Sequence, residues 1–273
     1  MPELPEVETV RKSLQRKLQG KTIVSAQVYW DRIIEFPGVS DFVTEVAGQT
    51  IIDMKRRGKW LLFELNDYYL LSHLRMEGKY FFRQPEEKRT RHQHVVFALD
   101  DGQELRYQDT RKFGKMHLIP KEIAYESEPL CQLGPEPDSS ELTVFYLKEK
   151  LKKKTIPIKT ALLDQTIVVG IGNIYVNEVL FLSQISPLRR ANEVTEDELQ
   201  TIIDQTRIVL KQAIDAGGTT IRSYTPEEGV TGLFQQELYV HTKEGEPCPN
   251  CGTPILKIQV NGRGTYYCPV CQK

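Results

Sequence analysis

The sequence predicts an α+β protein of two domains, in which an antiparallel β-sandwich with flanking helices precedes a mainly helical domain. Three observations lead to this prediction. Apolar residues of the first half alternate with a period of two, and those of the second half recur with a helical period. A length of 273 residues also exceeds what one small core requires, so two domains are the natural expectation.

We expect the first helix from Pro5 to Leu18, because its apolar residues recur at helical spacing. Pro5 suits a first-turn position and Gly20 suits the end of a helix. Glu3 and Glu6 then lie at the helix N-terminus, where the helix dipole stabilises carboxylates.

Short strands should follow the helix, because apolar and polar residues alternate and turn residues such as Asp100-Asp101-Gly102 separate the segments. Repeated short strands of this kind form antiparallel sandwiches or barrels. The expected strands are Val24–Trp30, Trp60–Leu65, Tyr69–Leu74, His94–Leu99, Glu104–Tyr107 and Met116–Ile119.

A polar, proline-rich segment, 121–141, has the composition of an interdomain linker. Helices are expected beyond it at Ile158–Val168 and Ile174–Leu182, and Thr195 with Glu198 forms a capping-box pattern ahead of a further helix. The predicted division is a β-sandwich domain at 1–120, the linker at 121–141, a helical domain at 142–235 and a cysteine-rich end at 236–273.

The end of the chain carries two C-x2-C pairs separated by sixteen residues, a spacing typical of a zinc site with four thiolate ligands. We expect one structural Zn²⁺, with the ligands Cys248, Cys251, Cys268 and Cys271. Disulfides are the alternative, but they fit poorly with a chain that has no secretory signal. Asn261-Gly262 predicts a tight hairpin turn between the pairs. Arg263 would lie at its tip, either beside a phosphate or as an incidental exposed side chain.

Charge and hydropathy indicate which kinds of partner the protein can have. A net charge of −1 gives no overall indication of a polyanionic partner, although basic runs at 55–59, 106–115 and 148–159 allow one positive face. The sequence has no run of about 18 apolar residues and no basic-then-apolar start. We therefore expect an intracellular protein without a membrane partner.

The first residues, Met1-Pro2-Glu3, suggest covalent chemistry. Methionine before a small residue is normally removed, which would leave Pro2 with a free secondary amine. An α-amino group has a pKa of about 7.7–8.0, so an unprotonated fraction near neutral pH can attack an aldehyde-like carbon and form an iminium. With Met1 retained, the nitrogen is an amide and cannot attack. An ordinary solvated start of the chain is the alternative.

Two glycine-containing loops are further candidates for binding. Gly170–Tyr175 joins two expected helices, like the turn of a helix-turn-helix unit, and the second helix could offer N–H groups to a phosphate. A purely structural turn is the alternative. Gly217–Thr225 is rich in hydroxyl groups and could wrap a polar ligand, although a plain surface loop has the same composition.

Together these motifs resemble the formamidopyrimidine-DNA glycosylase family, bacterial repair enzymes that remove oxidised purines. The resemblance runs almost from end to end and rests on several independent motifs in the order of the family. The matching segments are 2–10, 57–59, 72–78, 109–114, 133–137, 164–166, 170–178 and the four cysteines.

The resemblance implies a helix–two-turns–helix unit in the second domain and a zinc-finger hairpin at the end of the chain. It also implies a bifunctional glycosylase and AP lyase of base excision repair. Such an enzyme excises 8-oxoguanine and formamidopyrimidines from duplex DNA through a Schiff base on Pro2, then cleaves the strand by β,δ-elimination. The expected partner is damaged double-stranded DNA, bound by a monomer in the bacterial cytoplasm and associated with the nucleoid through DNA.

Roles for single residues follow from the same resemblance. Pro2 would attack sugar C1′, Glu3 would donate and accept protons, Glu6 would support the site, and Lys59 would contact the phosphate and lesion. The void left by the extruded nucleotide would be filled by Met76, Arg111 and Phe113, and backbone phosphates would be bound by His73, Asn173 and Arg263. The lesion loop would place near the everted base the residues Thr219, Arg222, Ser223 and Tyr224.

One departure and two alternatives accompany this interpretation. Asn177 stands where the family commonly has aspartate, which could alter a local cap or hydrogen bond. Endonuclease VIII, a related glycosylase for oxidised pyrimidines, is the nearest alternative, and Leu4 favours the purine enzyme. A non-catalytic, zinc-dependent DNA-binding protein is the other, but it would not need Pro2, Glu3 or Lys59.

Overall fold

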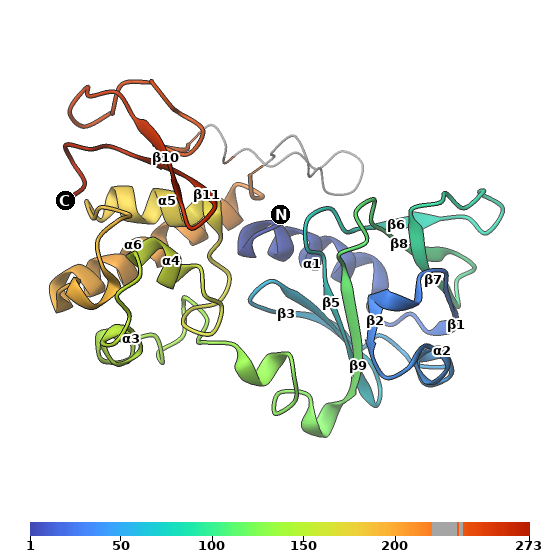
Figure 1. The fold of residues 1–273 in the computed structure, drawn as a ribbon. Coiled ribbons are helices and arrows are strands. Elements are labelled where there is room, and N and C mark those ends of the chain that lie inside the picture. Colours follow the sequence, from blue (N-terminus) through green and yellow to red (C-terminus); the bar gives the residue numbers. More distant parts are fainter. Residues whose placement is uncertain (220–233, 235–236) are drawn as a thin grey trace. The chain divides into compact units, whose positions relative to one another are not determined.

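The computed structural model describes residues 1–219, 234 and 237–273. The described chain forms two compact units (Figure 1). The first contains Met1–Pro2 and Glu6–Cys131, and the second contains Glu3–Pro5, Gln132–Thr219 and the described part of Leu233–Lys273. Three residues predicted for the lesion loop, Arg222, Ser223 and Tyr224, lie outside the described residues.

Two β-sheets make up most of the first unit, as the alternating pattern predicts. The antiparallel four-stranded sheet has the order β1 (Ile23–Val28), β7 (Gln93–Leu99), β8 (Glu104–Gln108), β6 (Lys79–Arg83). The five-stranded sheet has the order β2 (Ile34–Phe36), β9 (Lys115–Pro120), β5 (Tyr68–His73), β4 (Trp60–Glu64), β3 (Asp53–Arg57). Buried side chains of both sheets join one hydrophobic core, which confirms the predicted sandwich.

One strand pair departs from the antiparallel prediction, because β2 runs parallel to β9 with Ile34 opposite Met116. A parallel pair cannot be joined by a hairpin and needs a long connection. β2 lies early in the chain and β9 ends the sheet region, so the intervening strands and loops supply that connection.

Helices α1 (Leu4–Leu18) and α2 (Val39–Val46) contribute to the core of the sandwich. The first helix lies where the sequence places it. The second was not expected, although Val39, Phe42, Val43 and Val46 recur at helical spacing and pack on the core. It spans only eight residues, and a helical period is a clear signal over windows of about 11–18 residues. Short 3-10 turns occur at Asp31–Ile33, Lys121–Ile123, Leu130–Gln132 and Ala191–Glu193.

The second unit is mainly helical and ends in a hairpin (Figure 1). Its helices are α3 (Val144–Leu151), α4 (Ile158–Leu162), α5 (Asn173–Leu182) and α6 (Glu196–Asp215), and its strands are β10 (Leu256–Val260) and β11 (Arg263–Tyr267). The described ranges contain no helix with both the length and the apolar character that crossing a membrane requires.

Local signals place three boundaries of the second unit. The capping box before α6 is confirmed, because Thr195 and Glu198 each accept a hydrogen bond from the backbone N–H of the other. Asn261 and Gly262 both have positive φ, 47° and 71°, and form the predicted two-residue turn between β10 and β11. Helix α4 ends earlier than the predicted Val168, because Asp164 Oδ1 accepts the N–H of Thr166 at 3.0 Å and starts a turn.

A buried carboxylate anchors the segment that enters the C-terminal hairpin region. Glu178, on α5, accepts hydrogen bonds from the backbone N–H groups of Tyr239, Val240 and His241, at 2.6, 3.1 and 2.8 Å. Its neighbour Asn177 is buried and its Nδ2 lies 2.8 Å from His241 Nδ1. The amide at the position where the family commonly has aspartate thus bonds the imidazole of His241.

Candidate functional site

One end of the five-stranded sheet gathers the predicted residues of the first unit. Trp60 lies opposite His73, and His73 lies opposite Lys115. The same end of the sheet therefore holds the Gly58-Lys59 hairpin turn, the end of β5 and the start of β9. Gly58 has φ +56°, which suits the first position of such a two-residue turn, and Lys59 is buried.

His73 is held as a neutral hydrogen-bond donor. Its Nδ1 accepts the backbone N–H of Arg75 at 2.9 Å, which leaves the proton on Nε2. Burial, followed by the positive charges of Arg75 and Lys59, lowers the pKa of His73 to about 3. The ring of Trp60 packs edge-on against it, with the ring centroids 4.8 Å apart. His73 can therefore donate to an anion without carrying a charge.

Two turns at this end of the sheet carry the residues predicted to fill the void left by the extruded nucleotide. Met76 lies half-buried in the turn after β5, whereas Arg111 and Phe113 lie exposed in the turn between β8 and β9. Phe113 is 48% exposed, and the guanidinium of Arg111 lies over its ring, 4.9 Å from the centroid. An exposed phenylalanine with a stacked cation is a surface suited to contact with a ring or base.

In the second unit, the carboxylate of Glu3 binds the N-terminus of α5. Glu3 Oε1 accepts the N–H of Ile174 at 2.9 Å and Oε2 accepts that of Tyr175 at 3.4 Å. These are helix N–H groups that lack a partner within the helix. The sequence suggested that this helix N-terminus could bind a phosphate. In the structure, these two N–H groups donate to Glu3 instead.

Glycines make this close approach possible. A Cβ on Gly172 would lie 2.3 Å from Glu3 Cδ, and one on Gly170 would lie 2.3 Å from Leu4 Cδ1. Leu4 N also donates to Gly170 O at 3.1 Å. Pro2 and Glu6, on either side of this segment, are both buried.

Two donors from the helical region bind the tip of the C-terminal hairpin. The carbonyl of Gly264 accepts from Asn173 Nδ2 and from Lys159 Nζ, each at 3.0 Å, and Lys159 also donates to Thr265 Oγ1 at 2.7 Å. Arg263, next to this carbonyl, is exposed. The arrangement therefore brings two predicted phosphate-binding residues, Asn173 and Arg263, to one place.

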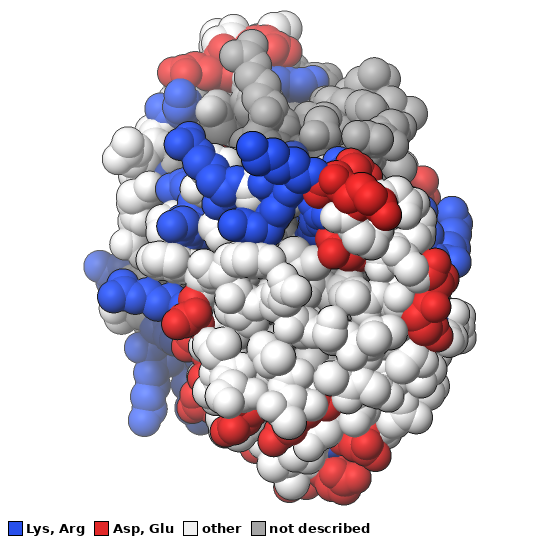
Figure 2. Space-filling view, turned by 90° about the vertical axis from the view of Figure 1, so that its right-hand side faces the viewer, with Lys and Arg blue, Asp and Glu red and all other residues white. Residues whose placement is uncertain are grey.

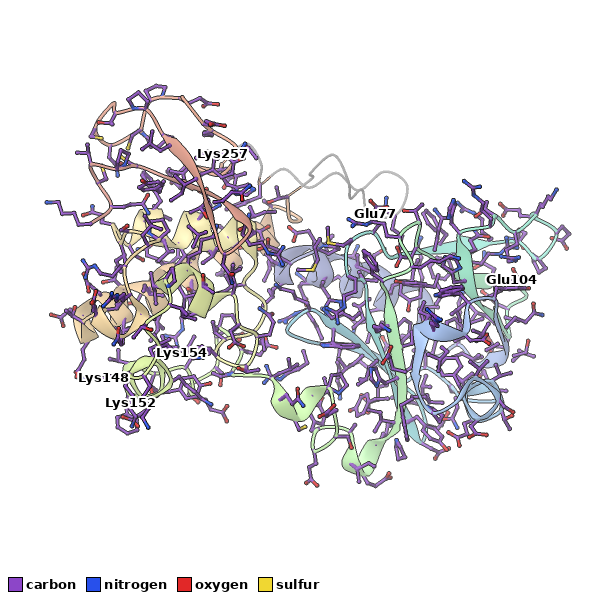
Figure 3. All side chains as sticks on the ribbon, in the orientation of Figure 1. Glu77, Glu104, Lys148, Lys152, Lys154 and Lys257 are labelled. Carbon is purple, nitrogen blue, oxygen red and sulfur yellow. The ribbon has the colours of Figure 1, made fainter. Side chains whose placement is uncertain are left out.

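Lys159 was missed by the sequence analysis, which treated it as part of a basic run. It is fully buried, and burial, together with the charge of Arg263, lowers its pKa to about 7, against an opposing effect of Glu3. Its apolar neighbours on α4 are the signal that could have separated it from the run. The other lysines behave differently: Lys148, Lys152 and Lys154 project outward and pair with Glu196, Glu149 and Asp164 (Figure 3).

Thr219 is the described residue of the predicted lesion loop. It is buried, and its Oγ1 lies 3.0 Å from the hydroxyl of Tyr175 on α5. Tyr175 is also the residue whose N–H donates to Glu3, so the start of the loop and the carboxylate share one helical residue.

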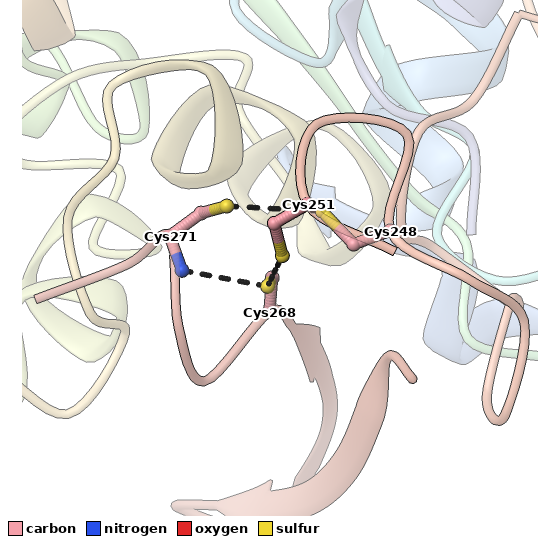
Figure 4. Close-up of side chains that lie close together, drawn as sticks. All are labelled: Cys248, Cys251, Cys268 and Cys271. Carbon is pink, nitrogen blue, oxygen red and sulfur yellow. Dashed lines mark hydrogen bonds between the residues drawn. The ribbon is translucent and has the colours of Figure 1, made fainter. Parts of the chain in front are cut away.

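The four cysteines form a site that fits zinc (Figure 4). Their sulfurs lie within 4.8 Å of one another, with 3.8 Å between Cys248 and Cys271 and 3.5 Å between Cys251 and Cys268. Tetrahedral zinc with Zn–S bonds of about 2.3 Å requires sulfur separations of about 3.8 Å. These thiolates would hold one structural Zn²⁺ and clamp the segments that flank β10 and β11.

Charge on the surface is segregated, although the net charge is −1. Figure 2 shows Lys and Arg side chains gathered in the upper part of one face, above a broad neutral surface bordered by acidic groups. Such a positive area can attract a polyanion to a protein with almost no net charge.

Family models match most of the chain. The formamidopyrimidine-DNA glycosylase N-terminal domain matches residues 1–116, the formamidopyrimidine-DNA glycosylase H2TH domain matches 133–225, and the zinc finger found in FPG and IleRS matches 245–273.

Full-length relatives are similar over the whole chain. Formamidopyrimidine-DNA glycosylase of Bacillus subtilis (strain 168) is 52% identical, with 100% of this chain and 99% of the relative covered. The protein of the same name from Shouchella clausii is 51% identical with the same coverage. Among solved structures, wild-type Lactococcus lactis Fpg with N7-benzyl-Fapy-dG DNA has a TM-score of 0.92 at 42% identity, with 100% of each chain covered. The Lactococcus lactis Fpg complex with abasic-site DNA gives the same score and identity, with 99% of each chain covered.

Removal of zinc should release the hairpin, because zinc binding and local folding are coupled. We expect Cys248→Ser to lose the bound metal and to raise amide hydrogen exchange in 256–267 at least tenfold, while β7 and β8 keep their protection. Cys131→Ser, at an exposed cysteine outside the cluster, is the control and should retain one zinc per chain. A Cys248→Ser variant with a protected hairpin would show that zinc is not needed for its structure.

Stability should fall as pH falls below about 6.5, because burial lowers the pKa of His73 to about 3 and that of His241 to about 4. Below pH 6.5 the two imidazoles bind protons in the unfolded chain but stay unprotonated in the folded chain. Each histidine therefore lowers the free energy of unfolding by about 1.4 kcal/mol per pH unit. Above 6.5 neither contributes.

Urea unfolding at pH 7.5 and 5.5 measures this effect. His73→Gln should show a smaller loss than the parent by about 1 kcal/mol. The surface variant His92→Gln should match the parent. An equal pH dependence in His73→Gln and the parent would contradict a neutral, buried His73.

Proposed function

Because the chain belongs to the formamidopyrimidine-DNA glycosylase family, we propose that Pro2 is the nucleophile and Glu3 the proton donor and acceptor of its reaction. The protein is a DNA glycosylase of base excision repair that acts on oxidised purines. The observation that carries the assignment is the binding of Glu3, the residue next to Pro2, to the N-terminus of α5.

The reaction begins when the free amine of Pro2 attacks C1′ of the damaged nucleotide. The bond between C1′ and the base breaks, and the base leaves with a proton supplied by Glu3. Glu3 then takes the proton released by the Pro2 nitrogen and passes a proton to the ring oxygen O4′, so the bond between C1′ and O4′ breaks and C1′ forms an iminium with Pro2. The iminium acidifies the neighbouring sugar carbon, so loss of a proton there expels the 3′ phosphate. A second elimination expels the 5′ phosphate, and water releases the sugar fragment from Pro2.

Glu3 suits this role because its position is fixed. Two backbone N–H groups hold its carboxylate, and a proton-transfer group must lie within hydrogen-bond reach of its target. Lys59 would supply a compact positive charge for the phosphate and lesion, and Glu6 would support the site. These assignments require Met1 to be absent, since an amide nitrogen at Pro2 has no nucleophilic lone pair.

DNA contacts complete the proposal. Met76 would fill the vacated stack, Phe113 would wedge and kink the duplex, and Arg111 would bond the orphaned cytosine. Phosphates would be bound by His73, Asn173 and Arg263, and the everted base would lie near Thr219, Arg222, Ser223 and Tyr224. We further propose the four-part division at 1–120, 121–141, 142–235 and 236–273, and a monomer that works in the cytoplasm, at the nucleoid through DNA.

Trapping with borohydride tests the nucleophile. Protein from which Met1 has been removed should form a reduced covalent adduct with duplex DNA containing 8-oxoguanine opposite cytosine, because the iminium is reducible. Protein that retains Met1 should bind the duplex but form no adduct. Glu3→Gln should release the base about 10²–10⁴-fold more slowly.

Glu149→Gln, at an exposed carboxylate on α3, is the matched control and should react like the parent. No adduct from processed, zinc-loaded protein would reject the catalytic assignment and favour a lesion-binding protein. Faster release of thymine glycol than of 8-oxoguanine would instead favour the activity of endonuclease VIII.

The salt dependence of binding should separate His73 from Arg263. Arg263→Gln should reduce the slope of log K against log[salt] by about 0.9, because one phosphate loses its neutralising charge. His73→Gln should weaken binding without changing the slope, since burial keeps the pKa of His73 near 3 and its contact neutral. Titrations at several salt concentrations with a duplex that carries a stable abasic analogue measure both. A slope change with His73→Gln would show that this histidine binds phosphate as a cation.

A further inference from the structure

A single buried carboxylate organises the turn that carries Arg111 and Phe113. Asp109 is fully buried, its Oδ1 accepts the N–H of Arg111 at 2.9 Å, and its Oδ2 accepts the N–H groups of Phe113 and Gly114, both at 2.8 Å. One side chain thus satisfies three backbone donors across the turn. A buried carboxylate with three such bonds fixes the backbone strongly, because each donor would otherwise lose its partner.

The backbone of Asp109 is fixed from the other side. Its N–H donates to the carbonyl of His92 at 2.9 Å, and its carbonyl accepts from His94 Nε2 at 2.8 Å. Burial lowers the pKa of His94, so this ring is a neutral donor. The start of the turn is therefore anchored to β7 and to the loop before it.

Lys112, between Arg111 and Phe113 in the turn, packs against Trp30. Lys112 has φ +58°, in the left-handed region, and its Nζ lies 3.9 Å from the centroid of the Trp30 ring. With Lys112 held by Trp30, the adjacent side chains of Arg111 and Phe113 are left exposed beside each other.

The turn that carries Met76 shares two supports with this one. Thr110 Oγ1 donates to the carboxylate of Glu77, which is labelled in Figure 3. The hydroxyl of the fully buried Tyr107 lies against the ends of both turns, since a Cβ would lie 2.2 Å from it at Gly78 and 1.8 Å from it at Gly114. Both glycines are therefore required by the same phenol.

We propose that the two turns form one preassembled unit and that Asp109 is the positioning residue that presents Arg111 and Phe113 to duplex DNA. This inference rests on the proposed function, because it takes these side chains to fill the void left by the extruded nucleotide. A turn ordered before binding loses less conformational entropy on binding, so disorder in it should weaken the recognition of a duplex lesion. The chemistry at Pro2 on a single strand needs neither side chain.

Asp109→Asn tests the proposal, because an amide cannot accept all three hydrogen bonds and its NH₂ group faces backbone donors. We expect at least tenfold weaker binding to a duplex with a stable abasic analogue opposite cytosine, and unchanged binding to the same strand alone. Cleavage of a preformed abasic site in single-stranded DNA should stay within twofold of the parent. Amide exchange at 111–114 should rise at least tenfold.

Asp100→Asn, at an exposed aspartate in the turn at the opposite end of β8, is the matched control and should leave all four measurements unchanged. If Asp109→Asn does not fold, Thr110→Val removes only the bond to Glu77 at an exposed position. It should weaken duplex binding about threefold with single-strand binding unchanged.

Duplex binding equal to the parent in a folded Asp109→Asn protein, or in Thr110→Val when that variant is needed, would overturn the proposal. An equal loss on single-stranded and duplex DNA would also overturn it, because that pattern indicates general destabilisation. If the parent binds duplex DNA but forms no covalent adduct, the proposed chemistry fails while the binding comparison still decides the role of Asp109.

Discussion

The bond between Glu3 and the N-terminus of α5 is the constraint on which the proposed chemistry depends. The first residues of a chain are usually poorly ordered unless other groups hold them. Here the backbone of Leu4 and the carboxylate of Glu3 are both bound by the turn that precedes α5 and by its first N–H groups. A nucleophile at the second residue can act repeatedly in one geometry only if the residues beside it are fixed in this way. Gly170 and Gly172 are part of that constraint, because a side chain at either position would displace the segment.

Buried basic groups with lowered pKa values are a second theme of the molecule. His73, His241 and Lys159 all have pKa values lowered by burial, and each serves as a hydrogen-bonding element of fixed position. A protein that binds a polyanion also needs exposed cations, and these lie on the surface in Figure 2. Buried hydrogen-bonding groups of fixed position give geometry, whereas exposed charges give attraction that salt can screen. The two functions are thus carried by different residues.

Sequence patterns formed by neighbouring residues correctly predicted local structure. The cysteine spacing, the Asn261-Gly262 turn, the capping box at Thr195 and the alternation of the strands each depend on neighbouring residues, and the structure confirms them. The parallel pairing of β2 with β9 and the hydrogen bonds of Lys159 to the C-terminal hairpin join residues far apart in the sequence, so no local pattern could reveal these contacts. Asp109 belongs to both kinds: its place in a family motif was visible, but its three backbone bonds were not. The proposed roles of Pro2 and Glu3 come from the resemblance to the family. The structure adds the two backbone hydrogen bonds that hold the carboxylate of Glu3.

The assignment of Glu3–Pro5 to the second unit has a consequence for the order of events during synthesis. Their partners at Gly170, Ile174 and Tyr175 are made about 170 residues later. At roughly 5–20 residues per second, that delay is on the order of 10–30 s. Throughout this interval Glu3 and Leu4 lack these hydrogen-bond partners. Once α5 forms, its first N–H groups bind Glu3, so docking of this segment has to await synthesis of the second unit.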